Sequence, residues 1–334
     1  MTRYAMLILV VGSLSFPRLM AQSSVEPKSV NAVTTALAFT QRYAFPAALV
    51  PGKDRDLKVK IIAGLGKASE LPWDAVPDVF DKDAFQKWSG GTNAISLVTM
   101  EKLMKGIPLS RTNMNAKIRL HADLLSTQFD IISEAHREPA AELVNWIVKN
   151  YQAGQSLGVI IICTGNTRRS MLGATMGNVA AAYYGLPNIG FFSGGTEPDA
   201  FNLRTISTLK EIGLEIEATG QEATRGTKNH PNPIYAVKWG TGLETREFSK
   251  KYGDAQNPQK DFAAIMVCSE ADASCPKVTG ASIRIPAPYL DPKAFDGAPI
   301  EAGKYAERRD DMGRLMLSVM MQAHRRLELD GKLK

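Results

Sequence analysis

The second half of the chain alternates short apolar runs with helical patterns, and this alternation constrains the fold more than any other feature. The first run, LGVIIIC, ends at Cys163, and similar runs follow at NIGFFSGG, FAAIMVC and ASIRIPA. Continuous apolar runs are typical of strands that are buried on both faces of a parallel sheet. Helical spacing separates the runs, across SMLGATMGNVAAAYYG, across NLRTISTLKEIG and from about residue 301 to 327. We therefore predict an α/β domain over residues 157–330, built on a four-stranded parallel sheet flanked by helices.

Two segments stand apart from this alternation. Residues 222–260 interrupt it with Asn, Pro, Gly and Lys, and we interpret them as an insertion that lies outside the core and forms a hairpin around residues 240–242. Residues 110–156 carry apolar residues at helical spacing, among them Leu120, Leu124 and Leu125, which predicts a helical pair that leads into the first strand.

The N-terminal part of the chain carries no chemistry that we can name. Residues 22–109 predict an extra, mostly helical region of unknown role. The first 21 residues have the pattern of an export signal, because Arg3 precedes the apolar stretch YAMLILVVGSLSF and LMA before Gln22 offers a cleavage point. The alternative is an uncleaved anchor, but the apolar stretch is shorter than the roughly 20 residues that span a bilayer. We expect a periplasmic or secreted protein with no stable membrane insertion after signal removal, and a cytoplasmic one if the signal is not cleaved.

Composition excludes several classes of function. The net charge of +6 and the pI near 9.1 are compatible with an anionic partner, but no arginine-rich helix, aromatic RNA-binding signature or metal-finger spacing accompanies them. The histidines lie without ligand spacing, and we read them as surface or helix residues. We expect no nucleic-acid partner, no metal and no cofactor. The histidines are His121, His136, His230 and His324.

The link CTGNTRRS, between the first apolar run and the following helix, predicts an anion site. Ligands bind beyond the carboxyl ends of parallel strands, and the N-terminus of a helix presents free N–H groups and a positive dipole end. A tetrahedral oxyanion such as phosphate or arsenate suits this environment. The predicted oxyanion-binding residues are Thr164, Gly165, Asn166, Thr167, Arg168 and Ser170.

The residue types in this link also indicate catalysis. Cys163, beside the helix end and Arg169, is expected to form a nucleophilic thiolate near neutral pH, and Ser170 to donate a hydrogen bond to it. Arg169 offers a planar fork for two anion oxygens. Gly165 permits unusual backbone angles, and Asn166 tolerates a left-handed conformation. The alternative, a strand-terminal cysteine that is only a small buried hydrophobe, explains neither the Gly-Asn pair nor the two arginines.

These residues carry a family resemblance. The C-x5-R-S loop with an internal Gly-Asn pair resembles the low-molecular-weight protein tyrosine phosphatases and the thioredoxin-coupled arsenate reductases that share their fold, over about residues 157–327. The stretch FFSGGTEPDAFNLRTISTLKEIG also looks like the family's second strand and helix, with Asn202 where the family often has Asn. Both branches use an aspartate of an Asp-Pro pair as the general acid, which implies that role for Asp291 before Pro292. The alternative for this pair is an ordinary turn.

The other two cysteines resemble the relay of the arsenate reductases. On that reading Cys163 attacks arsenate, Cys268 displaces arsenite by forming a disulfide with Cys163, and Cys275 closes a disulfide with Cys268 that a thioredoxin-like dithiol protein reduces. A helix between Cys268 and Cys275 would hold them roughly 10 Å apart, too far for a disulfide, so this segment must unwind. Its small and acidic residues would let it. The alternative is that Cys268 is a core residue and Cys275 a bystander.

Two departures from the family bear on the substrate. Arg168 stands where many members have a second loop cysteine, and Lys293 and Ala294 follow the Asp-Pro pair where the phosphatases commonly have aromatic residues. The second departure favours a small inorganic oxyanion, and export would favour a phosphatase, which needs no reductant. The function that we predict from the sequence is that of an arsenate reductase-like enzyme. The alternatives are a phosphatase that hydrolyses phosphomonoesters through a phosphocysteine intermediate and a non-catalytic oxyanion-binding module.

Overall fold

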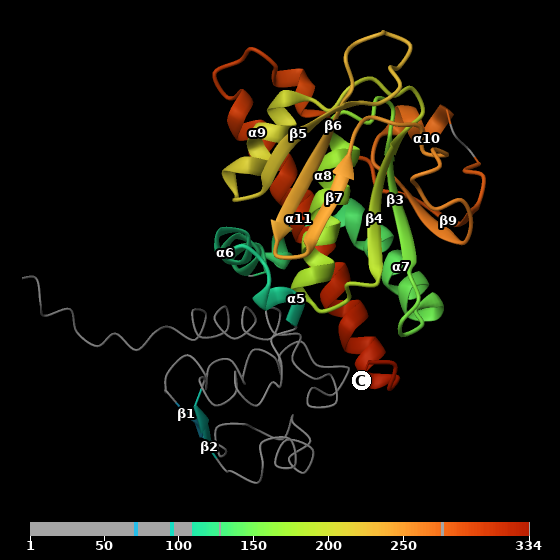
Figure 1. Cartoon of the computed structure of the whole chain (residues 1–334). Helices are drawn as coiled ribbons and strands as arrows, with labels where there is room; N and C mark the ends of the chain where they lie inside the picture. Colours follow the sequence, from blue (N-terminus) through green and yellow to red (C-terminus); the bar gives the residue numbers. More distant parts are fainter. Residues whose placement is uncertain (1–69, 73–93, 97–108, 127, 275–276, 334) are drawn as a thin grey trace, which may run out of the picture.

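The computed structural model of the chain describes residues 70–72, 94–96, 109–126, 128–274 and 277–333 (Figure 1). The expected export signal lies outside the described residues, as does Cys275. Of the expected helical region at residues 22–109, the described pieces are chiefly the strands β1 (Glu70–Pro72) and β2 (Ala94–Ser96), which pair antiparallel.

The predicted four-stranded parallel sheet is confirmed. Its strands are β4 (Ile189–Gly195), β3 (Leu157–Cys163), β8 (Phe262–Met266) and β9 (Ala281–Pro286), in that order, and every neighbouring pair is parallel. Each residue of β8 is buried, as the continuous apolar run requires. The first strand of the domain therefore lies in the middle of the sheet, and its carboxyl end opens between two neighbours.

Helix α8 (Arg169–Tyr183) packs directly on the centre of the sheet, and all of its residues are buried. Glycines make this close approach possible. A Cβ at Gly173 would lie 2.9 Å from Cγ2 of Ile161, and one at Gly177 would collide with the ring of Phe191. The N-terminus of α8 is thereby fixed against the end of β3.

The other helices build a layer around α8. The C-terminal helix α11 (Glu301–Leu329) runs along α8 and α7 (Glu134–Asn150), and α7 reaches β9 (Figure 1). The predicted helical pair is confirmed as α6 (Ala116–Leu125) and α7. Of the leucines that indicated α6, Leu125 is buried, but Leu120 and Leu124 are exposed, and Ile118 and Ala122 complete the buried face. The short elements are α5 (Leu109–Thr112), η3 (Phe129–Ile131), α9 (Leu203–Glu211), α10 (Ser269–Ser274) and η4 (Pro292–Phe295).

The insertion completes a second sheet, whose first strand precedes it. Strands β5 (Glu215–Glu222), β6 (Pro233–Gly240) and β7 (Leu243–Glu247) pair antiparallel, and the β6–β7 hairpin is the one predicted around residues 240–242. The expectation that residues 222–260 lie outside the core is wrong in part. Val237 and Trp239 point to one face of β6, as the period of a strand dictates, and they join the main hydrophobic core beside the lead-in helices.

Within the described part of the chain, none of the helices combines the length and the apolar character that a bilayer span needs.

Candidate active site

The link between β3 and α8 forms the floor of a pocket of about 510 Å³. Cys163, Arg169 and Asp291, which the sequence analysis assigned to catalysis, all line it. The link itself contributes Thr164, Gly165, Thr167 and Arg168, and the walls come from the segment after β4, from the insertion and from the Asp-Pro segment. The wall residues are Glu197, Asp199, Ala200, Phe201, Asn202, Leu203, Thr227, Lys228, His230, Asp291 and Lys293.

A chain of hydrogen bonds ends at the thiol of Cys163. The backbone N–H of Lys250 donates to Oδ1 of Asn166 at 2.8 Å, so the amide nitrogen of Asn166 faces Ser170 and donates to its Oγ at 2.8 Å. The hydroxyl hydrogen of Ser170 is then available to Sγ of Cys163, which lies 3.1 Å from Oγ. Asn166 and Ser170 are fully buried and Cys163 is 3% exposed. This arrangement directs a hydroxyl donor at the sulfur of Cys163 and fixes its position at the end of β3.

The left-handed residue of the link is Asn166. It adopts φ +45°, the conformation predicted for it, whereas Gly165 is absent from the residues with positive φ. What Gly165 offers is space, because a Cβ there would lie 3.3 Å from Cγ2 of Thr167.

Arg169 is the first residue of α8, and its side chain is directed toward the Asp-Pro segment. Nη1 donates to the carbonyl oxygen of Tyr289 at 2.9 Å, and Nη2 lies 3.0 Å from Oδ2 of Asp291. A weaker contact of 3.9 Å joins Nη1 to Glu270. Nε is buried and has no hydrogen-bond partner among the described residues. A buried N–H with no partner is costly, so a ligand oxygen at this point would be strongly favoured.

Asp291 is held at the start of a short helix. Its Oδ1 accepts the backbone N–H of Lys293 at 3.0 Å, and Pro292 occupies the first helical position of η4, where its missing N–H costs nothing. The second carboxylate oxygen stays directed at Arg169. The side chain of Asp291 is 31% exposed, so it faces the pocket and can exchange protons with solvent.

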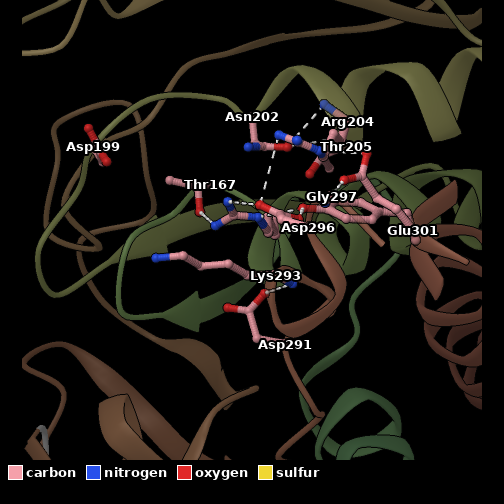
Figure 2. A network of polar contacts seen from close by, with 12 residues as sticks. Thr167, Asp199, Asn202, Arg204, Thr205, Asp291, Lys293, Asp296, Gly297 and Glu301 are labelled. Atoms are coloured by element: carbon pink, nitrogen blue, oxygen red, sulfur yellow. Dashed lines mark hydrogen bonds and ion pairs between the residues drawn. The ribbon is translucent and has the colours of Figure 1, made fainter. Parts of the chain in front are cut away.

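Arg168, the neighbour of Arg169, belongs to a different network, which includes Asp296. Its Nε donates to the hydroxyl of Tyr305 at 2.8 Å and its Nη2 lies 3.4 Å from Asp296. Figure 2 shows Asp296 near Arg204 and Glu301. The Tyr305 hydroxyl donates to Asp296 at 2.7 Å, and burial together with this bond raises the pKa of Tyr305 to about 12. Arg168 lines the pocket, but its charge is paired with Asp296. Its hydrogen bond to Tyr305 ties the link to α11.

Cys268 lies two residues after the end of β8 and is fully buried, with the thiol free. The strand register puts it level with Thr164, whose Oγ1 lies 3.5 Å from Sγ of Cys268. The residues that follow form helix α10, and Arg284 holds it by donating to the carbonyl and the carboxylate of Asp272 at 2.6 Å each. The segment after Cys268, which the disulfide relay requires to unwind, is thus helical from Ser269 to Ser274 and is held by the hydrogen bonds from Arg284.

The insertion supplies site residues that sequence reasoning missed. Ser249, two residues after β7, donates from Oγ to the carbonyl of Gly165 at 3.0 Å and accepts the N–H of Asp199 at 2.9 Å. His230 Nδ1 and Lys228 Nζ lie 2.7 and 3.3 Å from the carboxylate of Asp199, at the rim of the pocket. His230, read as a scattered surface histidine, is 60% exposed but belongs to the pocket wall. No local signal marks these residues, because only the fold brings them to the link.

Asn202 also has a defined task. Its side chain accepts the N–H groups of Arg204 and Thr205 and so caps α9, while its own N–H donates to the carbonyl of Thr167 at 3.2 Å. The start of α9 is thereby fixed to the link.

Searches among protein-family models and among curated proteins returned no match to the chain. Within the described ranges, no group of three or more His, Cys, Asp and Glu side chains is placed to hold a metal ion. The inference of function therefore rests on the pocket itself.

Proposed function

We propose that the protein hydrolyses phosphomonoesters through a phosphocysteine intermediate, on the low-molecular-weight phosphatase fold. The strand order supports the fold assignment, because the first strand of the domain lies between the second and the third, and the fourth is at the edge. The loop that follows the first strand carries the nucleophile, as in the family that the sequence resembles.

The reaction uses three side chains in two steps. The thiolate of Cys163 attacks phosphorus, an S–P bond forms, and the P–O bond to the leaving group breaks as Asp291 gives its proton to the departing oxygen. Water then attacks phosphorus, Asp291 takes the proton back, and the S–P bond breaks to release phosphate and the thiolate. Arg169 and the backbone N–H groups of the link balance the charge on the phosphoryl oxygens in both steps.

The observation that carries this proposal is the placement of Arg169. Its buried Nε–H has no partner among the described residues, while its two terminal nitrogens fix the position of the Asp291 segment. An oxyanion in the link would accept from Nε and would lie between Cys163 and Asp291, since all three residues line one pocket. A nucleophile, an anion fork and a proton donor around one pocket are what phosphoryl transfer to cysteine requires.

Arsenate reduction is the second candidate, and the free thiol of Cys268 beside Thr164 supports it. Cys163 would form a thioester of arsenate with loss of water. Attack of Cys268 on the sulfur of Cys163 would then form a disulfide and expel arsenite with the electron pair, and Cys275 would release Cys163 before an external dithiol reduces the final disulfide.

Two features favour hydrolysis over this relay. Helix α10 lies between Cys268 and Cys275 and is held by Arg284, so the relay needs a rearrangement that hydrolysis does not. The pocket of about 510 Å³ also exceeds the space of a bare oxyanion, which is on the order of two to three water volumes of about 30 Å³ each. The extra space suits an organic leaving group.

A paired assay tests the proposal. The wild-type protein is expected to hydrolyse p-nitrophenyl phosphate, and Cys163→Ser to abolish this activity. Asp291→Asn should lower kcat by about 10²-fold or more, while acid-quenched enzyme still carries phosphate on Cys163. Cys268→Ser serves as the matched thiol control and should keep hydrolysis.

Three outcomes contradict the proposal in different ways. Turnover of arsenate with a dithiol donor, lost in Cys268→Ser, in a protein that hydrolyses no ester would establish the reductase. Binding of phosphate without turnover of either substrate would leave only the oxyanion-binding module. Full hydrolysis by Cys163→Ser would exclude a phosphocysteine intermediate.

A further inference from the structure

The cations that line the pocket differ in whether they have a partner. Arg169 pairs with Asp291, Arg168 with Asp296 and Lys228 with Asp199, at 3.0, 3.4 and 3.3 Å. Lys293 is exposed and lines the same pocket, and no salt bridge or hydrogen bond of its ammonium group occurs among the described residues. It is therefore the lining cation whose charge is available to a ligand.

The position of Lys293 is tied to the general acid. Its backbone N–H donates to Asp291, and both residues lie at the start of η4, whose Pro292 restricts the backbone between them. Figure 2 shows the Lys293 side chain extended between Thr167 and Asp291. Because Asp291 protonates the leaving oxygen, the group that departs must lie beside Lys293.

An apolar surface accompanies this charge. Leu203, at the start of α9, is 72% exposed and lines the same pocket. An exposed leucine beside an available cation suits a leaving group that has an apolar body and carries a negative charge.

We propose that Lys293 selects phosphomonoesters whose leaving group bears a second anionic group, a carboxylate or a further phosphate, on an apolar body. This inference rests on the proposed function, because it assigns the leaving-group side of the same site. Glu197 also lines the pocket, but it follows β4, whereas the Asp-Pro segment follows β9 at the other edge of the sheet. Among the described residues, no ion pair joins Glu197 to Lys293.

The test compares phenyl phosphate, 4-carboxyphenyl phosphate and 1,4-phenylene bisphosphate as substrates. For each protein, the ratio of kcat/KM for a charged ester to kcat/KM for phenyl phosphate is measured, and intrinsic ester reactivity cancels when proteins are compared. Lys293→Met should lower this ratio by about 2- to 5-fold, Lys293→Glu should lower it further, and Lys293→Arg should keep it. The two charged esters show which anion the site prefers.

The matched control is Lys210→Met, which removes one positive charge from an exposed position of α9 that does not line the pocket. Its ratio should equal that of the wild type, and added salt should reduce the wild-type preference, since exposed charges are screened. An unchanged ratio in Lys293→Met, or an equal fall in Lys210→Met, overturns the assignment.

Failure of the proposed function is recognised separately. If the wild type hydrolyses none of the esters, the assignment is tested by calorimetric binding of the same esters to Cys163→Ser, with and without Lys293→Met. A preference for the charged esters that depends on Lys293 would then support the subsite although the enzyme class is wrong. Equal affinities would reject the subsite as well.

Discussion

The floor and the rim of the pocket are built in opposite ways. The floor is one contiguous link, residues 163–170, in which the proposed nucleophile Cys163 ends β3, and the proposed anion fork Arg169 and the hydroxyl partner Ser170 begin α8. The rim and outer support come from the insertion, where Ser249 and Lys250 bond to Gly165 and Asn166 across the fold. Residues 163–170 thus carry the proposed chemistry, whereas the insertion, which is distant in sequence, holds this link in place.

The largest expected effect separates two adjacent arginines of the floor. Arg169→Lys should lower kcat/KM for p-nitrophenyl phosphate by about 10²- to 10³-fold, because one ammonium group cannot reach Tyr289, Asp291 and the anion together. Arg168→Lys is the matched control and should cost far less, since its guanidinium faces Tyr305 and Asp296. Equal losses in the two variants would mean that Arg168 also binds the substrate.

The second prediction concerns the insertion. The side chains of Glu247 and Lys250 are 7% and 4% exposed and lie 3.5 Å apart. Glu247→Gln leaves a buried ammonium group without a counter-charge, which should lower the free energy of unfolding by about 3 kcal/mol. Urea denaturation measures this loss, and Glu247→Gln combined with Lys250→Met should recover part of it.

The same sheet offers a control for this pair. Glu244 and Lys238 are also 3.5 Å apart but are 59% and 47% exposed, so Glu244→Gln should change the unfolding free energy little. A loss in Glu247→Gln no larger than that in Glu244→Gln would show that the insertion does not anchor the link through this pair.

The two regions also differ in what the sequence could predict. The strands and the link could be predicted because their sequence signals are local. Continuous apolar residues indicated β3 and β8, and the Gly-Asn pair between Cys163 and Arg169 indicated the link. The core position of Val237 and Trp239 was missed, since polar and turn residues dominate the segment around them. The partners of Asn166 and Gly165 could not be predicted, because Lys250 and Ser249 approach the link only after the second sheet has formed.

Leu120 and Leu124 illustrate a third limit. Their spacing correctly indicated a helix, but periodicity does not say which of two apolar stripes faces the core, and packing against α11 buries Ile118, Ala122 and Leu125. In the same way, composition suggested that the segment after Cys268 would unwind readily. Arg284, distant in sequence, holds it as a helix.

The third prediction tests Ser249 as a positioning residue. Ser249→Ala removes the hydroxyl that bonds Gly165 and the N–H of Asp199, and one hydrogen bond is worth about 1 kcal/mol, or about 5-fold in rate. We expect kcat to fall by this factor with KM nearly constant. Thr219→Ala removes an equivalent hydroxyl-to-carbonyl bond of 3.0 Å in the same sheet, and it should leave kcat unaltered. A fall in stability with no change in kcat would assign Ser249 to folding alone.

The smallest expected effect belongs to the rim. His230 is 60% exposed and bonds Asp199, which also pairs with Lys228, so His230→Gln should lower kcat/KM by less than about 3-fold, as for other exposed pairs. Asp199→Asn should cost more, because it releases the side chains of His230 and Lys228 at once. A loss above tenfold in His230→Gln, confined to kcat, would mean that the imidazole transfers a proton during turnover. The insertion would then take part in the chemistry as well as in shaping the link, and the division between floor and rim would fail.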